Sequence, residues 1–468
     1  MARRRITRAG AMGGALVILV VIGAAVGAGL TTIKMGKQPD GSFIVSTWQH
    51  IQPGTVAFDG RPVDLALRPG TDVFAVLGQT AVFLASQSGV IPGTNVPLGA
   101  GASYHGILWA PDGGHLYASV SNGTIVEAEY GPGIILKKSR VLIPKPEGAG
   151  GNPRPGGMDI TPDGKTLYVA DCDRNSVLEI DLASGKCVRE FPVQNLPFDV
   201  KLNADGSVLV VTNWGGRLPK PDDKTGQSAE AEIVVDDAWS AATGTVSLIS
   251  RATGQTSSIA VGLHPTAVAI DGPTAYIANA GSDSISLIDV AQQKLKQTIS
   301  ISWHEETRFG SMPCALAVRD RTLYVGCGGD NALYELDLNS LKVKGCRPAG
   351  YYPTGVAISP DGRTAFVVNT KGNGSVRRTV NGMVGNAHDF QGTVSALDLS
   401  SDLGAATERV AANDGWARTE AKLHPKMAVY NGAIKHVIYI IKENRTYDQI
   451  LGDMPEGNGD PKLCEFGE

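Results

Sequence analysis

Apolar and polar residues alternate along the chain from residue 41 to about residue 410, in short runs separated by turn residues. The clearest example extends from Pro155 to Phe191, where a Pro-Asp-Gly turn is followed by LYVA, VLEID and a Ser-Gly-Lys turn. Alternation with a period of two indicates strands with one face toward a core, and the turn residues fix the register of each hairpin. This run therefore predicts four short antiparallel strands joined by three hairpins.

The same unit recurs seven times along the chain. Its opening strands begin near Pro62, Tyr104, Pro155, Pro197, Pro265, Pro313 and Pro353. Four-stranded units of roughly forty residues are typical of propeller blades, which bury both sheet faces only when the ring closes. We therefore predict an all-β fold, a seven-bladed β-propeller over residues 41–410. The segment Ser42–Ala57 precedes the first opening strand, and we expect it to supply the outer strand of the last blade.

Three of the units carry a recognisable sequence: LYVADCDRNSVLEID, AYIANAGSDSISLID and LYVGCGGDNALYELD. They resemble the YVTN-type repeat of bacterial seven-bladed β-propellers, and the resemblance extends over most of the chain. It implies the fold but not an activity, because propellers serve many unrelated functions. The ligand of the propeller is therefore left unknown.

Two of the predicted blades contain long insertions, Gly215–Thr243 and Lys371–Gln391. Long excursions from a rigid scaffold often form binding surfaces. The first insertion is acidic, with Asp222, Asp223, Glu230, Glu232, Asp236 and Asp237. It lacks the alternating ligands and the glycine of a calcium loop, so a solvated loop is favoured over a calcium site.

The residue two positions after each opening residue is expected to approach the central tunnel. These residues are mostly small, and two are carboxylates: Asp64, Gly157, Asp199, Ala267, Ala315 and Gly355. A bound metal needs three or four convergent ligands, so catalysis in the tunnel is not expected. His105 and Trp109 in the second blade are interpreted as packing residues.

The six cysteines form neither a C-x-x-C nor a C-x-x-C-H motif, which leaves zinc ribbons and c-type haem attachment unsupported. An exported chain permits disulfides, and one bridge within a blade is plausible between Cys172 and Cys187. A second is plausible among Cys314, Cys327 and Cys346. The alternative is that all of them are buried free thiols.

The N-terminus has four arginines, at positions 3, 4, 5 and 8, followed by an uncharged apolar stretch over residues 9–33. This stretch is long enough to cross a bilayer, and its basic flank predicts that the rest of the chain is exported. Residues 1–40 are therefore predicted to be a single-pass membrane anchor with a periplasmic or extracellular propeller. The alternative is a cleaved signal peptide and a secreted protein. The formal net charge of −4 argues against nucleic acid as a partner, and we expect a monomer.

Residues 411–433 are interpreted as a linker, and residues 434–468 as a separate segment. Val437–Ile441 has the composition of a strand buried on both faces. Polar residues follow at once, and Thr446 with Gln449 forms a capping box for a short helix that Gly452 can close. The pattern predicts strand, polar turn and helix, so Glu443 and Asn444 lie at the carboxyl end of a strand, where α/β sheets bind ligands. An ordinary turn with solvated charges fits the same pattern.

The stretch Glu443–Asp448 reads ENRTYD and is preceded by the Lys-His strand IKHVIYII. It resembles the start of phosphoesterases of the alkaline-phosphatase superfamily, the branch with phospholipases C and acid phosphatases. By this resemblance Glu443 and Asn444 are metal ligands for a divalent ion that polarises a phosphoryl group. The nucleophile and the other ligands are expected downstream of residue 468, so this chain resembles a truncated enzyme.

Two functions from different classes follow from the sequence. The first is an exported, metal-dependent phosphoesterase whose catalytic domain is incomplete in this chain. The second is a membrane-tethered propeller that binds a ligand or a partner without catalysis. Under either hypothesis, we expect no phosphate-ester hydrolysis by these 468 residues alone.

Overall fold

The computed structural model describes residues 36–45, 47–228, 231–301, 310–374, 379–380, 383–384, 389–415, 447–457 and 459–464. Antiparallel strands account for most of these residues. No helix within the described ranges is long and apolar enough to cross a membrane. The predicted anchor at residues 9–33 and the metal ligands Glu443 and Asn444 lie outside the described residues.

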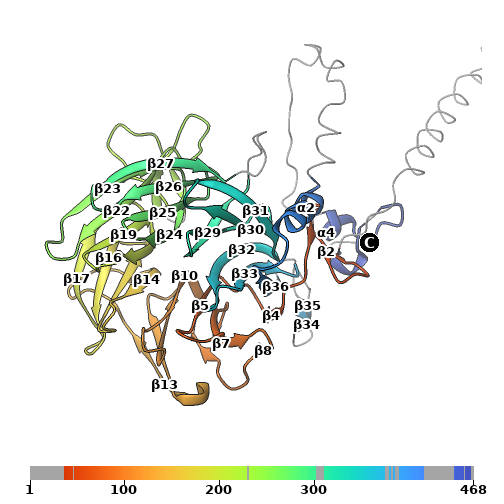
Figure 1. The fold of residues 1–468 in the computed structure, drawn as a ribbon, viewed down its shortest axis with the longest axis horizontal. Helices are drawn as coiled ribbons and strands as arrows, with labels where there is room; N and C mark the ends of the chain where they lie inside the picture. The colour runs from red at the N-terminus through yellow and green to blue at the C-terminus, as the bar shows by residue number, and fades with distance from the viewer. Residues whose placement is uncertain are drawn as a thin grey trace, which may run out of the picture.

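Seven antiparallel sheets are arranged around a ring, each with its first strand innermost (Figure 1). The first sheet contains β5 (Asp64–Leu67), β6 (Phe74–Leu77), β7 (Ala81–Ser86) and β8 (Gly89–Val90), with β9 (Val96–Pro97) also paired to β7. The second contains β10 (Ala102–Trp109), β11 (His115–Val120), β12 (Ile125–Tyr130) and β13 (Leu136–Leu142), with a short 3-10 turn, η1 (Pro132–Ile134). The third contains β14 (Pro155–Ile160), β15 (Thr166–Asp171), β16 (Ser176–Asp181) and β17 (Lys186–Pro192).

The next three sheets repeat this order. The fourth contains β18 (Pro197–Leu202), β19 (Val208–Asn213), β22 (Gly244–Ser250) and β23 (Thr256–Val261). The fifth contains β24 (Pro265–Asp271), β25 (Thr274–Asn279), β26 (Ser284–Asp289) and β27 (Lys294–Ser300). The sixth contains β28 (Pro313–Arg319), β29 (Thr322–Cys327), β30 (Ala332–Asp337) and β31 (Lys342–Pro348).

The seventh sheet closes the ring, because its outer strand comes from the N-terminal part of the chain. It contains β32 (Tyr351–Ile358), β33 (Thr364–Gly372), β36 (Gln391–Asp398) and β4 (Val56–Asp59). The inner strands β5 and β32 contact each other across the closure. The prediction that this outer strand comes from before the first blade is confirmed, but only Val56 and Ala57 of the predicted segment belong to it. The earlier residues form a separate small sheet of β1 (Gly36–Lys37), β2 (Phe43–Ile44) and β3 (His50–Ile51).

The hydrophobic core consists of layers between neighbouring blades. One such layer joins Val210 and Val246 of the fourth blade to Val268 and Ile277 of the fifth, all of them buried. Successive side chains of a strand point to opposite faces of its sheet, and each face packs against a different neighbouring blade. This explains why the strands read as apolar runs rather than as a simple apolar and polar alternation.

Buried asparagines end the second strand of three blades. The side-chain amide of Asn279 donates to the hydroxyls of Ser284 and Ser286 on the third strand, at 3.1 and 3.0 Å. Asn213 and Asn369 make equivalent bonds in their own blades. The third blade has Asp171 at this position, directly opposite Ser176. These side chains tie the second strand to the third at the end of the strand pair in the fourth and fifth blades and three residues before it in the seventh.

Helix α2 (Leu403–Asp414) crosses the boundary predicted between propeller and linker. Asp402 caps its first turn, and Gly415 ends it in the left-handed conformation. The Thr407 hydroxyl accepts a hydrogen bond from the Cys346 amide at 3.0 Å, which fastens the helix to the outer strand of the sixth blade. The sequence signal is weak because Thr407 and Val410 are the only residues of the helix that are buried.

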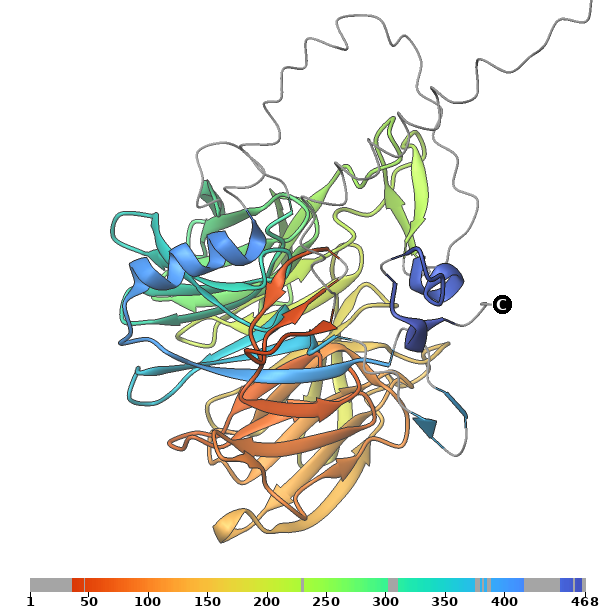
Figure 2. The same cartoon turned by 90° about the vertical axis from the view of Figure 1, so that its right-hand side faces the viewer.

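Both long insertions contain short hairpins. The insertion in the fourth blade forms β20 (Thr225–Ser228) with β21 (Ala231–Val234), which projects from the ring (Figure 2). The insertion in the seventh blade contains β34 (Thr379–Val380) with β35 (Met383–Val384). The C-terminal segment contains α4 (Tyr447–Leu451) and a 3-10 turn, η3 (Pro461–Leu463). Helix α4 agrees with the short helix that the sequence predicts after Thr446.

Candidate functional site

One face of the ring gathers the features that distinguish this propeller. Because the strands of a blade alternate in direction, the loops entering the first strand and those joining the second to the third lie on the same face. Both insertions follow second strands, β19 and β33, so both arise on this face. We call it the entry face.

A cavity of about 340 Å³ lies at the entry-face mouth of the central tunnel, and we call it the basin. Six of the seven blades contribute the residue one position after their opening residue. These residues are Val63, His105, Phe198, Thr266, Cys314 and Thr354. Larger side chains complete the wall: Tyr104, Trp214, His264, Met312 and Tyr352. The lining is thus aromatic and apolar, with a few polar groups between.

The basin continues into a side lobe of about 240 Å³, lined by Tyr104, Cys172, Leu196, Phe198 and Trp214. Tyr104, Phe198 and Trp214 belong to both spaces. Phe198 therefore stands between the basin and the lobe. Its ring stacks on that of His105, with centroids 5.4 Å apart and 14° between the planes.

An unusual backbone conformation, with a positive φ angle, places several of these side chains in the basin wall. His264, Met312 and Tyr352 each precede the opening proline of a blade, and their φ angles are 48°, 53° and 66°. Proline disfavours the α-helical region for the residue before it, and a positive φ is itself costly for residues other than glycine. The same left-handed step occurs at Leu196 in the lobe, with φ 52°. Repetition of this strain around one cavity is typical of a functional surface.

Trp214 is held from two sides. Its ring stacks on His264, with centroids 4.1 Å apart, and burial lowers the pKa of this histidine. On the other side the base of the insertion packs against it through Ile233 and Val235, in a cluster that includes Leu196. The insertion thereby shapes the basin wall, which gives a physical role to a segment that the sequence shows only as an acidic excursion.

Below the basin a smaller cavity of about 120 Å³ lies in the tunnel. Its walls include the predicted tunnel residues Asp64, Asp199, Ala267, Ala315 and Gly355. Gly157 is required beside them, because a Cβ at that position would lie 2.3 Å from Asp199 Oδ1. The prediction that the residue two positions after each opening residue approaches the tunnel is therefore confirmed for Asp64, Asp199, Ala267, Ala315 and Gly355.

His105 packs against Phe198, and it also belongs to a cluster of charged side chains that its interpretation as a packing residue does not include. Its Nδ1 lies 3.1 Å from Asp64 Oδ2, and its Nε2 lies 3.7 Å from Asp199 Oδ1. Lys201 Nζ lies 3.4 Å from the same Asp199 oxygen and donates to the carbonyl of Met158 at 3.1 Å. The signal that could reveal this cluster is the alignment of all blades, in which His105 is one residue from the tunnel position. Trp109, in contrast, is buried in the core as predicted.

The tunnel carboxylates also join neighbouring blades. Asp64 accepts hydrogen bonds from the amides of Gly106 and Ile107 in the second blade. Asp199 accepts one from Val268 in the fifth blade, at 3.3 Å. Asp159 of the third blade accepts one from Leu202 in the fourth, at 2.7 Å. A structural role therefore accounts for the presence of carboxylates at these positions.

The electrostatics of the tunnel cluster are nearly balanced. Burial raises the pKa values of Asp64 and Asp159, although His105 opposes this for the first and Lys201 for the second. Burial acts the same way on Asp199, but Lys201 and His105 outweigh it and lower the pKa to about 2. Burial would lower the pKa of His105, but Asp64 and Asp199 outweigh it and raise it. His105 thus lies between two carboxylates that favour its protonated form.

This arrangement is better suited to binding than to covalent catalysis. Both ring nitrogens of His105 already face carboxylates. Burial raises the pKa of the Cys314 thiol to about 11, so this sulfur is not a nucleophile at neutral pH. Within the described residues, no three His, Cys, Asp or Glu side chains are placed to hold a metal ion.

The cysteines and the acidic insertion have structural explanations. All six cysteines are free thiols, so the plausible bridge between Cys172 and Cys187 is absent. Cys172 instead donates to the carbonyl of Pro197 in the next blade. In the insertion, Asp223 pairs with Arg217 and Asp237 with Lys224, which agrees with the favoured solvated loop.

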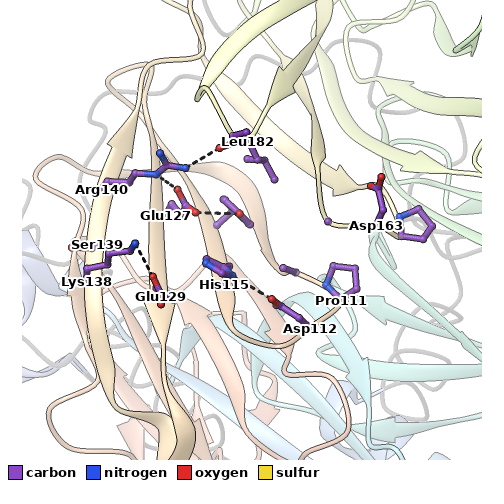
Figure 3. Close-up of a pocket in the computed structure, with 15 residues that line it drawn as sticks. Pro111, Asp112, His115, Glu127, Glu129, Lys138, Ser139, Arg140, Asp163 and Leu182 are labelled. Carbon is purple, nitrogen blue, oxygen red and sulfur yellow. Dashed lines mark hydrogen bonds and ion pairs between the residues drawn. The ribbon is translucent and has the colours of Figure 1, made fainter.

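A further cavity, of about 510 Å³, opens on the opposite face between the second and third blades (Figure 3). Its charged side chains pair with one another. Arg140 binds Glu127 and also donates to the carbonyl of Leu182 at 2.9 Å, and Lys138 pairs with Glu129 at 2.9 Å. The two ion pairs link β12 to β13 within the second blade, and the bond from Arg140 to Leu182 joins this blade to the third. These partners explain the polarity of the cavity without a ligand.

Comparisons with known proteins support the fold of this chain but indicate no activity for it. No protein-family model matches the chain, and no curated protein matches its sequence. Among solved structures, a hydrazine synthase of Kuenenia stuttgartiensis is similar, with a TM-score of 0.54 and 18% sequence identity. The match covers 74% of this chain and 97% of that chain. At this identity the similarity shows an all-β, propeller-like fold and carries no activity over.

Proposed function

We propose that this protein is a binding propeller that holds a small, flat, largely apolar ligand in the basin. The observation that carries this proposal is the composition of the basin wall, where aromatic side chains from several blades surround one open cavity. Ligand sites are typically concave, mostly apolar and furnished with a few polar groups. The tunnel cluster below supplies those polar groups, while its paired charges leave no free nucleophile.

Binding of aromatic fragments tests this proposal. Naphthalene carrying an acetate, an acetamide or an aminoethyl group is titrated into the protein by calorimetry. We expect at least one probe to bind, and Phe198→Ala to weaken it about tenfold through lost stacking and apolar contact. Trp239→Ala is the matched control, because this tryptophan is 67% exposed on the insertion and lies outside the basin. Absence of binding by all three probes, or equal effects of the two variants, would contradict the proposal.

A second candidate function is the metal-dependent phosphoesterase that the ENRTYD motif suggests. Of that motif the structure describes Tyr447 and Asp448, at the start of α4. Asp448 accepts a hydrogen bond from the Asp460 amide at 2.9 Å, so this carboxylate organises its own loop. The candidate requires an α/β domain encoded directly after the codon for Glu468, and sequencing that locus tests it. Hydrolysis of p-nitrophenyl phosphate by these 468 residues alone would contradict our expectation that they are inactive.

The membrane anchor over residues 1–40 is proposed on the same footing as the phosphoesterase, from the sequence alone. Carbonate extraction of membranes from cells that express the chain distinguishes an anchor from a cleaved signal. A propeller retained in the pellet supports the anchor. A propeller released into the medium supports the secreted alternative.

A further inference from the structure

The rim of the basin at the seventh and first blades contains two cations. Lys371 follows Thr370 of the basin wall, and its Nζ lies 4.6 Å from the ring centroid of Tyr352 and 5.0 Å from that of Tyr351. Arg61 lies two residues before Val63 of the wall, and its guanidinium lies over the ring of Phe390. Lys371 is thus held by a tyrosine of the basin wall, and Arg61 is two residues from another position of that wall.

These two cations differ from the others around the entry face. Arg154 pairs with Asp173 at 3.0 Å, and Arg217 pairs with Asp223. Neither Lys371 nor Arg61 forms an ion pair with a carboxylate among the described residues. Burial, and then the charge of Arg61, lower the pKa of Lys371. Among the described residues, the contacts of Lys371 and Arg61 are with aromatic rings rather than with carboxylates, although Asp59 and Asp389 lie near Arg61 and Phe390 along the chain.

The carboxylates of the tunnel do not neutralise this charge. Asp64 is the one nearest in sequence to Arg61, but it is engaged by His105 and by two backbone amides of the second blade. Asp199 is engaged by Lys201 and His105. A ligand in the basin therefore meets aromatic walls, a nearly neutral floor and a positive rim.

From this arrangement we propose that the ligand of the basin is an aromatic anion, a flat ring system bearing a carboxylate or a similar acidic group. The ring packs between Phe198 and Tyr352, and the acidic group binds the ammonium of Lys371 and the guanidinium of Arg61. The inference rests on the proposed binding function and specifies the chemical class of its ligand. A charge-assisted hydrogen bond to Lys371 would use donors that the tyrosine faces leave free.

The three naphthalene probes test the sign of the charge, since they share a ring system and differ only in their substituent. We expect the acetate to bind about tenfold more tightly than the acetamide, and the aminoethyl compound to bind most weakly. Affinity for the acetate is expected to fall between 20 and 200 mM salt, roughly as screening of a partly exposed ion pair predicts. The acetamide affinity is expected to stay unchanged across that range.

Variants assign the effect to the rim. Lys371→Gln is expected to lower acetate affinity about fivefold and to change acetamide affinity less than about twofold. Lys371→Arg retains the charge and is expected to retain acetate affinity, and Lys296→Gln on the exposed face of β27 is the control. Equal losses for acetate and acetamide in Lys371→Gln, or tightest binding by the aminoethyl probe, would overturn the inference while leaving the binding function intact. Absence of binding by all three probes would instead overturn the proposed function.

Discussion

Asp171 is the one carboxylate at a position where three other blades have asparagine, and replacing it tests the electrostatics of the core. Its side chain is fully buried, and burial raises its pKa to about 6 despite hydrogen bonding by the Arg154 amide and the charge of Arg174. Its Oδ2 has no hydrogen-bond donor, and the Ser176 hydroxyl opposite lacks a partner as well. In Asp171→Asn the new amide can donate to Ser176, as the amide of Asn279 donates to Ser284 at 3.1 Å.

The expected gain follows from the pKa. A rise from the ordinary 3.8 to about 6 corresponds to about 3 kcal/mol of lost stability once the carboxyl is ionised. Loss of the long contact with Arg174, at 3.5 Å, removes less than about 1 kcal/mol. The new hydrogen bond returns about 1 kcal/mol. We therefore expect a net stabilisation of about 2–3 kcal/mol above neutral pH.

The direction in which the stability difference between Asp171→Asn and the parent changes with pH is the most stringent test of this prediction. A carboxyl whose pKa is raised by folding costs nothing below its unfolded pKa, and the cost grows as the pH rises toward the folded value. Thermal unfolding of both proteins is measured from pH 4 to pH 8. The variant should exceed the parent by about 2–3 °C at pH 8, at roughly 1 °C per kcal/mol for a chain of this size. At pH 4 most of that difference should disappear.

Asn279→Asp is the reverse control, since it places a carboxylate at the equivalent position of the fifth blade. It should destabilise the protein at pH 8 and do so less at pH 4. A Tm difference for Asp171→Asn that is independent of pH, or a loss of stability at pH 8, would refute the electrostatic explanation.

Three further variants test other parts of the structure. Gly157→Ala should destabilise the protein by about 2–3 kcal/mol in thermal unfolding, because its Cβ would collide with Asp199, whereas Gly150→Ala, which meets nothing within 4 Å, should have no effect. In His105→Gln the imidazole between Asp64 and Asp199 is lost. Because folding raises the pKa of His105, the stabilisation that its protonated form provides is complete below the ordinary pKa and is lost as the pH rises. The Tm of the variant should therefore fall further below that of the parent at pH 6 than at pH 9. Thr407→Val should leave the buried Cys346 amide without its acceptor, at a cost of about 1–3 kcal/mol, and should speed hydrogen exchange of that amide; equal exchange in the two proteins would show that α2 is held by other contacts.

The architecture was accessible from the sequence because each blade repeats the same signals. Turn residues such as the Pro-Asp-Gly after Thr161 occur at the same place in several units, so a weak local pattern is confirmed by its repetition. The sequence predicts that an N-terminal strand closes the ring, but it does not place that strand at β4. Strand β4 contains only four residues. The segment before it is also rich in β-branched and aromatic residues. Helix α2 offers too few buried positions to produce a clear period.

The candidate site was less accessible because a ring brings together residues that are distant in sequence. The residue two positions after each opening residue is predicted to lie at the tunnel, and Asp64 and Asp199 are found there. The position one residue after each opening residue supplies His105 and Phe198 to the basin. The contribution of the insertion to the Trp214 wall depends on tertiary packing that no spacing rule reports. The C-terminal ligands Glu443 and Asn444 stay a prediction.

The pairing of β4 with β36, which we call the clasp because it closes the ring, has a consequence for biosynthesis. Thr55 bonds to the backbone of Ala396, 341 residues later in the chain. At synthesis rates of about 5–20 residues per second, the N-terminal strand waits roughly 17–70 s for its partner. During that interval the first six blades exist as an open arc with two uncovered ends, and the emerging apolar strands of the first blade have no neighbour. A factor that shields those ends until the last blade emerges would therefore raise the yield of closed rings, and a clasp supplied as a separate peptide would compete with the chain's own strand only before closure.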